Sequence, residues 1–120
     1  MIDEEFARNP EGGPVHARAR LLAMEGRHVQ ARALLKPVPA NAGLSRTFHH
    51  TAYQRACVYA LVGDAEASVE WVERTVKTGM PIYPAFARDT CFDPIRGSTR
   101  FTRFMAELKP VWDDYRRKMQ

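Results

Sequence analysis

The sequence predicts an all-α fold, a solenoid of two helix–turn–helix repeats with a C-terminal capping helix. Three observations support this prediction. Glycines interrupt helical stretches at Gly26 and Gly63, small and apolar residues recur between the two halves, and apolar residues recur at helical spacing in the last segment. With 120 residues and an ordinary apolar content, the chain is long enough for one compact domain with its own core.

The first part of the chain is predicted to contain a flexible arm followed by a helix pair. Residues 1–13 include two glycines and a proline but few apolar side chains, so we expect them to form a flexible arm or a linker from an upstream part. The helical domain is predicted to span residues 14–120. Its first helix ends at Gly26, and its second ends before Pro37, because proline cannot continue a helix.

The second helix pair turns at Gly63 and Asp64. The stretch before Gly63 reads as one helix from about residue 46, and Gly63 provides the left-handed conformation that commonly ends a helix. Asp64 is a good N-cap for the helix that follows. The sequence therefore predicts a tight turn between two antiparallel helices, with Ala56 packed close to Ser68.

The two helix pairs share a sequence repeat. Gly26 and Gly63 are 37 residues apart. When the first pair is shifted by this distance, its residues fall on similar ones in the second: Ala19 on Ala56, Leu22 on Tyr59, Met24 on Leu61, Ala31 on Ser68 and Leu35 on Val72. Small residues let paired helices approach closely. A period of about 34 residues, lengthened by a few in the loop between the pairs, indicates a helix–turn–helix solenoid.

This pattern resembles the tetratricopeptide repeat. The second pair has the family's residue types at its characteristic positions, Ala56, Tyr59, Gly63, Ser68 and Val72, and the first pair is a weaker copy. The segment Asp93-Pro94-Ile95-Arg96, followed by Phe101, is similar to the C-terminal end of many bacterial proteins of this family. The resemblance is strongest over residues 49–101. It implies a right-handed solenoid, here of two repeats.

The resemblance also implies where a partner binds. In tetratricopeptide solenoids, the first helix of each pair lines a concave face that binds peptides. The matching positions are His16, Arg20 and Met24 in the first repeat and His50, Tyr53, Cys57 and Leu61 in the second. The Lys and Asn clamp with which some family members hold a terminal carboxylate is absent here. We therefore expect a protein or peptide partner on this face, but not a chaperone's C-terminal tail.

The last segment is predicted to cap the solenoid, because two repeats are fewer than the three that a free-standing solenoid usually needs. Its apolar residues share one helical stripe, made up of Phe101, Phe104, Met105, Leu108, Trp112, Tyr115 and Met119. The stripe keeps its phase across Pro110, which predicts one kinked helix. Ser98 or Thr99 provides its N-cap.

Charge and hydropathy argue against several function classes. The formal charge is +4 and basic residues are spread among acidic ones rather than gathered in blocks, so nucleic-acid binding is not expected. No apolar run is long enough to span a bilayer, and the acidic N-terminal residues do not form a signal peptide. We therefore expect a cytoplasmic protein that does not bind membranes. The two cysteines, Cys57 and Cys91, do not suggest a disulfide scaffold in such a protein.

No catalytic or metal site is predicted. His49 and His50 are adjacent on a helix, point about 100° apart, and do not chelate one ion well. Cys57 reads as a small buried hydrophobe, and no phosphate-binding loop, nucleophile elbow or zinc-ligand spacing is present. The expected function is protein–protein interaction without catalysis or a cofactor. The alternatives are a homodimer on the same apolar face and, after it, an enzyme or a small-ligand binder.

Overall fold

The computed structural model describes residues 13–35, 37, 48–79 and 81–119. These residues form six α-helices and one 3₁₀ helix: α2 (Gly13–Met24), α3 (His28–Ala33), α4 (Phe48–Leu61), α5 (Ala65–Thr78), α6 (Tyr83–Arg88), η2 (Thr90–Ile95) and α7 (Thr99–Lys118). No strand occurs in these ranges, so the all-α prediction is confirmed for them. The predicted arm lies outside the described residues except for Gly13, which already belongs to α2.

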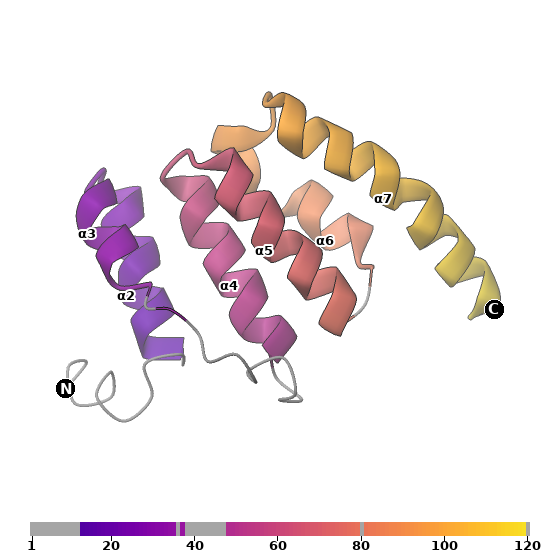
Figure 1. Ribbon diagram of the computed structural model, residues 1–120, viewed down its shortest axis with the longest axis horizontal. Helices are drawn as coiled ribbons and strands as arrows, with labels where there is room; N and C mark the ends of the chain where they lie inside the picture. Colours follow the sequence, from indigo (N-terminus) through magenta and orange to yellow (C-terminus); the bar gives the residue numbers. More distant parts are fainter. Residues whose placement is uncertain (1–12, 36, 38–47, 80, 120) are drawn as a thin grey trace.

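The helices lie side by side in sequence order (Figure 1). The pair α2/α3 packs against α4, α4 and α5 form a second pair, and η2 packs on α4. Helix α7 packs on α5 and α6 at the other end of the row. None of the described helices combines the length and the apolar character needed to cross a membrane.

Two apolar clusters hold this row of helices together. The smaller cluster lies between α2, α3 and α4 and includes Ala19, Ala31 and Val58, all of them fully buried. The larger cluster joins α4 and α5 to α6, η2 and α7, with Phe86 and Phe92 at 0 % exposure. Helix α4 contributes residues to both clusters, so it is the central element of the fold.

Both helix pairs turn through the same hydrogen-bonded motif. The N–H of Gly63 donates to the carbonyl of Ala60, and the N–H of Asp64 donates to the carbonyl of Tyr59, at 3.0 and 2.9 Å. The turn at Gly26 repeats this pattern, and both glycines have left-handed φ angles, 85° and 84°. This is the Schellman motif, in which a left-handed residue ends the helix. The predicted turn at Gly63 is therefore confirmed.

The contact between α4 and α5 also agrees with the prediction. Ala56 and Ser68 are both fully buried, and the Ser68 hydroxyl donates a 2.8 Å hydrogen bond to the carbonyl of Ala56. Small side chains at these two positions leave room for a bond from one helix to the backbone of the other. Asp64 caps α5 by accepting a hydrogen bond from the N–H of Ala67 at 3.0 Å.

The turn at Gly63 requires a left-handed backbone, and the energetic cost of placing a side chain there can be measured. A Cβ at Gly63 would meet no atom within 4 Å, so only the left-handed backbone resists a side chain there. We expect Gly63→Ala to lower the free energy of unfolding by about 1–2 kcal/mol. Gly97→Ala is the matched control, because Gly97 has equal space and no left-handed φ. Urea denaturation of both variants checks this, and equal losses would contradict the conformational explanation.

The C-terminal segment forms one helix through Pro110, as predicted, but only its first half packs on the body. Ser98 caps α7 by accepting from the N–H of Phe101, and Phe101, Phe104 and Leu108 are buried. Arg100 joins α7 to α5 through ion pairs with Glu66 and Glu73. The second half extends past α6 (Figure 1).

The apolar stripe that was predicted to cap the solenoid is therefore buried only in its first half, and the prediction is wrong for its second half. Met119 is 70 % exposed, and Val111, next to the stripe, is 52 % exposed. Trp112 and Tyr115 are half-buried and stack on each other, with ring centroids 6.0 Å apart. The helical period was correct, but α5 and α6 lie along the first half of α7, and its last turns extend beyond them (Figure 1).

Candidate functional site

The residues predicted to bind a partner are separated by burial into two groups. His16 and Cys57 are interior, at 2 % and 0 % exposure. Arg20, Tyr53 and Leu61 are half-buried, whereas Met24 and His50 are exposed. As the chain is folded here, His16 and Cys57 therefore offer no surface to a partner, and the exposed and half-buried residues are the ones that remain candidates.

Cys57 is buried because a later segment covers its face of α4. The 3₁₀ helix η2 packs on α4 and brings Cys91 against Cys57. The two cysteines form a disulfide, with Cα atoms 5.3 Å apart, a distance typical of this bond. The sequence-based interpretation of Cys57 as an unpaired small hydrophobe is therefore wrong. The bond links positions 34 residues apart, and nothing in their spacing indicated that η2 folds back there.

Asp89 organises the surroundings of this disulfide, and sequence reasoning did not select it. Its Oδ1 accepts a hydrogen bond from the N–H of Cys91 at 3.0 Å, which caps η2. Its Oδ2 accepts a 2.6 Å hydrogen bond from the Tyr53 hydroxyl and lies 3.9 Å from the Sγ of Cys57. The Arg96 guanidinium donates to the carbonyl of Asp89 at 2.6 Å and fixes the backbone.

Tyr53 connects this polar cluster to the aromatic core. Burial, followed by the hydrogen bond and the negative charge of Asp89, raises the pKa of Tyr53 well above its ordinary value, while the positive charge of Arg20 acts in the opposite direction. The hydroxyl therefore stays a hydrogen-bond donor. The ring stacks on Phe86 at 5.6 Å and meets Phe92 edge-on at 6.0 Å. Tyr53 thus belongs partly to the core.

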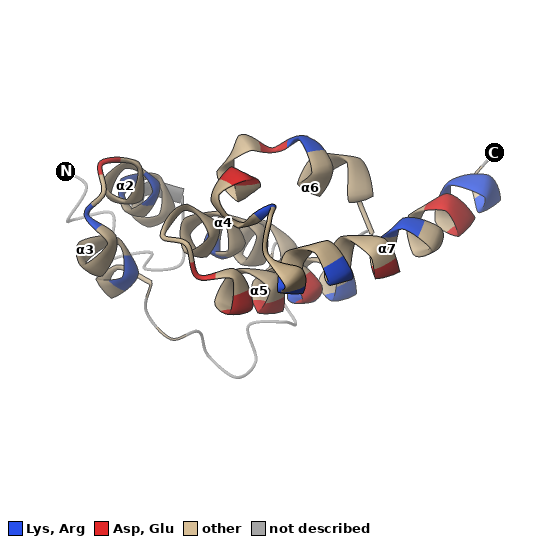
Figure 2. Cartoon of the chain, turned by 90° about the horizontal axis from the view of Figure 1, so that it is seen from above, with Lys and Arg blue, Asp and Glu red and all other residues tan. Residues whose placement is uncertain are grey.

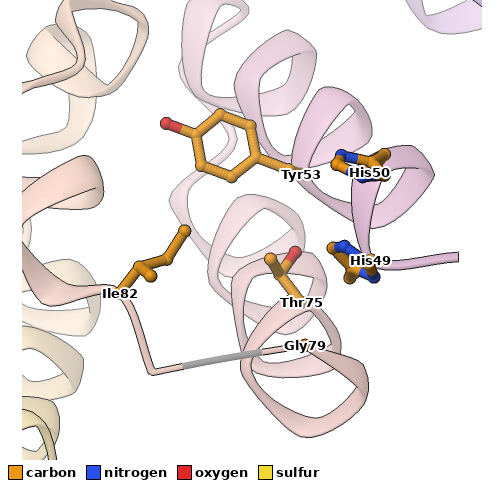
Figure 3. Close-up of a pocket in the computed structure, with 6 residues that line it drawn as sticks. All are labelled: His49, His50, Tyr53, Thr75, Gly79 and Ile82. Atoms are coloured by element: carbon orange, nitrogen blue, oxygen red, sulfur yellow. The ribbon is translucent and has the colours of Figure 1, made fainter. Parts of the chain in front are cut away.

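A pocket of about 390 Å³ opens beside Tyr53 at one end of the α4/α5 pair. Its lining residues are His49, His50, Tyr53, Thr75, Gly79 and Ile82. Figure 3 shows the histidines and Tyr53 extending from α4, with Ile82 approaching from the opposite side. The walls consist largely of carbon atoms. Such a cavity, apolar with a few polar groups, is typical of binding sites for small molecules or side chains.

His49 is a polar residue of the pocket with unused hydrogen-bonding capacity. The Nδ1 of His49 is buried and has no hydrogen-bond partner among the described residues. The two imidazole rings lie 4.1 Å apart. The Thr75 hydroxyl is already engaged, because it donates to the carbonyl of Trp71 at 2.8 Å. Gly79 lets α5 approach α4, since a Cβ there would lie 3.0 Å from the Cβ of His49.

The structure therefore brings three of the predicted residues together. His50 and Tyr53 line the pocket, and Arg20 lies within electrostatic reach of Tyr53. The positive charge of Arg20 acts on the Tyr53 hydroxyl, and the described residues form no ion pair with Arg20. Met24 and Leu61 lie toward the other ends of their helices. The pocket residues Thr75, Gly79 and Ile82 gave no sequence signal, because each belongs to a segment with its own helical or turn pattern.

Comparisons of the chain with models of known protein families, with curated proteins and with solved structures found no match. The resemblance to tetratricopeptide proteins therefore depends on residues of this chain alone. The two glycine turns and the Ala56–Ser68 contact involve residues on which this resemblance depends.

Proposed function

We propose that this chain is a non-catalytic binding module, a right-handed solenoid of two tetratricopeptide-like repeats that holds a segment of a partner protein. The repeated Schellman turns at Gly26 and Gly63 support the two-repeat architecture, and α7 takes the role of the capping helix. The single observation that carries the proposed function is the open, mainly apolar pocket at the end of the second helix pair.

The pocket suits one large apolar side chain of a peptide. Its volume of about 390 Å³ lies in the lower part of the range of ligand sites, about 300–1,000 Å³. A few buried anchors supply most of the binding energy in protein interfaces, and aromatic residues are the commonest of them. His49 and His50 provide ring faces, and the buried Nδ1 of His49 provides a nitrogen without a hydrogen-bond partner among the described residues. We therefore expect an aromatic or long aliphatic side chain to enter the pocket.

Charge specifies the second feature of the partner. Arg20 is half-buried and lies beside Tyr53. A guanidinium favours a carboxylate, which it can hold through two parallel hydrogen bonds. The partner segment is therefore proposed to carry an acidic residue near its apolar anchor. Basic and acidic residues are interspersed along α5 and α7 (Figure 2), which supports a protein partner over nucleic acid or an anionic membrane.

The proposal is tested by selecting peptides from a random library on the folded protein and measuring their affinity by calorimetry. We expect enrichment of peptides with one large apolar and one acidic residue. Arg20→Ala and His50→Ala should each weaken these peptides about tenfold or more, which is about 1.4 kcal/mol. Arg103→Ala on α7 is the control, because Arg103 is exposed and lies outside the pocket lining. Selected peptides that bind all three variants as tightly as the wild type would contradict the proposal.

Self-association is the second candidate function, and the exposed end of α7 is the observation that favours it. Val111 and Met119 are exposed, and the adjacent Trp112–Tyr115 stack presents apolar ring surface. A second copy of the chain packed on this stripe would cover it. Light scattering at several concentrations separates the candidates, because a dimer that is lost on Val111→Asp requires this surface and not the pocket.

A further inference from the structure

The cluster around the disulfide combines three groups that ligate metals. The two sulfurs of Cys57 and Cys91 and a carboxylate oxygen of Asp89 all lie within 4.8 Å of one another. We propose that, when the disulfide is reduced, Cys57, Asp89 and Cys91 bind one thiophilic divalent cation, Zn²⁺ above others. This site does not depend on the peptide-binding function proposed above, although Tyr53 lines the pocket and also hydrogen-bonds Asp89.

The spacing of the ligand atoms fits tetrahedral zinc. Bonds of about 2.3 Å to sulfur and about 2.1 Å to oxygen place two thiolates about 3.8 Å apart and a thiolate and a carboxylate oxygen about 3.6 Å apart. The Sγ of Cys57 already lies 3.9 Å from Oδ2 of Asp89. The Cα atoms of the two cysteines are 5.3 Å apart, so rotation of their side chains separates the sulfurs to the required distance without backbone movement.

Asp89 is held in place as a metal ligand by the groups behind it. Its Oδ1 accepts from the N–H of Cys91, and its Oδ2 accepts from the Tyr53 hydroxyl. Hydrogen bonds of this kind orient ligands and typically change metal affinity 10–100-fold. In the disulfide form, by contrast, the carboxylate oxygen faces a sulfur that has no proton to donate. A cation bound by the two sulfurs would give this oxygen a positive partner on the side where the disulfide offers none.

The charge of the cluster and its partial exposure to solvent also suit a zinc site. Two thiolates, one carboxylate and Zn²⁺ leave a net charge of −1, and the positive charge of Arg20 acts on Tyr53, which hydrogen-bonds the carboxylate. The cysteines are buried, which protects their bonds to the metal, whereas Asp89 is only half-buried. Three protein ligands leave the fourth position to water, which can reach the cluster past Asp89. The cytosol keeps thiols reduced, so in that compartment the dithiol form would be the one available to the metal.

A water-soluble phosphine reduces the disulfide. The phosphine attacks one sulfur and breaks the S–S bond, water supplies the oxygen of the phosphine oxide, and both cysteines gain a proton. Binding of the cation then releases these two thiol protons. The protein is desalted under argon before metal is added, so that neither oxidant nor reductant is left in the titration.

The test is a titration of the reduced full chain with Co²⁺, a coloured substitute for Zn²⁺, followed by displacement with Zn²⁺. We expect one Co²⁺ per chain, with thiolate-to-metal charge-transfer absorption and ligand-field bands of a tetrahedral site. Oxidised protein should show neither, and it retains the fold. Asp89→Asn should weaken binding at least tenfold, whereas Asp93→Asn, an exposed acidic neighbour in η2, should not. Absence of the charge-transfer band in reduced wild-type protein, or equal affinity of the two Asn variants, would overturn the proposal.

Discussion

Deletion of residues 100–120 is expected to unfold the domain. These residues include Phe101, Phe104 and Leu108, which are buried against α5, α6 and η2. Burial of three such side chains contributes about 5–9 kcal/mol at about 1.5–3 kcal/mol each. A typical domain has a net stability of only about 5–15 kcal/mol. The truncated chain should therefore show no cooperative thermal transition by circular dichroism and should aggregate through the uncovered apolar surface.

A shorter deletion is the control for this experiment. Removal of residues 111–120 takes away the exposed half of α7 and leaves the three buried side chains and the Arg100 ion pairs in place. We expect the shortened chain to melt cooperatively within a few degrees of the wild type. If the longer deletion also melts at the wild-type temperature, α7 does not cap the fold. If the shorter deletion unfolds the domain, the exposed stripe is covered in solution.

The parts of the fold that depend on local chemistry could be predicted from the sequence. Gly63 must adopt a left-handed conformation to end α4, and Asp64 and Ser98 are short polar residues that cap the helices after them. The Ala56–Ser68 contact followed from a repeat of small residues. In each case the cause lies within a few residues or within one periodic pattern, so it can be read without the tertiary structure.

The candidate site was predicted only in part, because its geometry depends on how η2 returns to α4. The helical pattern correctly placed Tyr53 and Cys57 on one face of α4, but it did not show that η2 covers this face. Sequence reasoning did not select Asp89, although its carboxylate joins Tyr53 to the cysteine pair. Periodicity likewise defined the stripe of α7 but not which of its turns would have a neighbouring helix. Such pairings are set by contacts between distant segments.

Reduction of the Cys57–Cys91 disulfide is expected to lower the free energy of unfolding by about 3–4 kcal/mol. The bond closes a segment of 34 residues, and its loss restores the corresponding freedom to the unfolded chain. Phe92 and Ile95 stay buried beside it, so η2 should remain docked on α4 under native conditions. Urea denaturation with and without a phosphine measures the effect. A Cys57→Ala/Cys91→Ala variant is the control, and a phosphine-induced shift of equal size in that variant would exclude the disulfide as its cause.

Zinc should return part of this stability to the reduced wild-type chain. A cation that binds only the folded state adds about 2.7 kcal/mol when its free concentration is a hundred times its Kd. The proposed site requires both thiolates. With zinc bound, Cys57 in α4 and Cys91 in η2 would be linked through the metal, as the disulfide links them in the oxidised protein. Zn²⁺ should therefore raise the urea midpoint of reduced wild-type protein and leave that of the double alanine variant unchanged. An equal rise in both proteins would place the zinc elsewhere, and no rise in either would show that the disulfide alone makes this link.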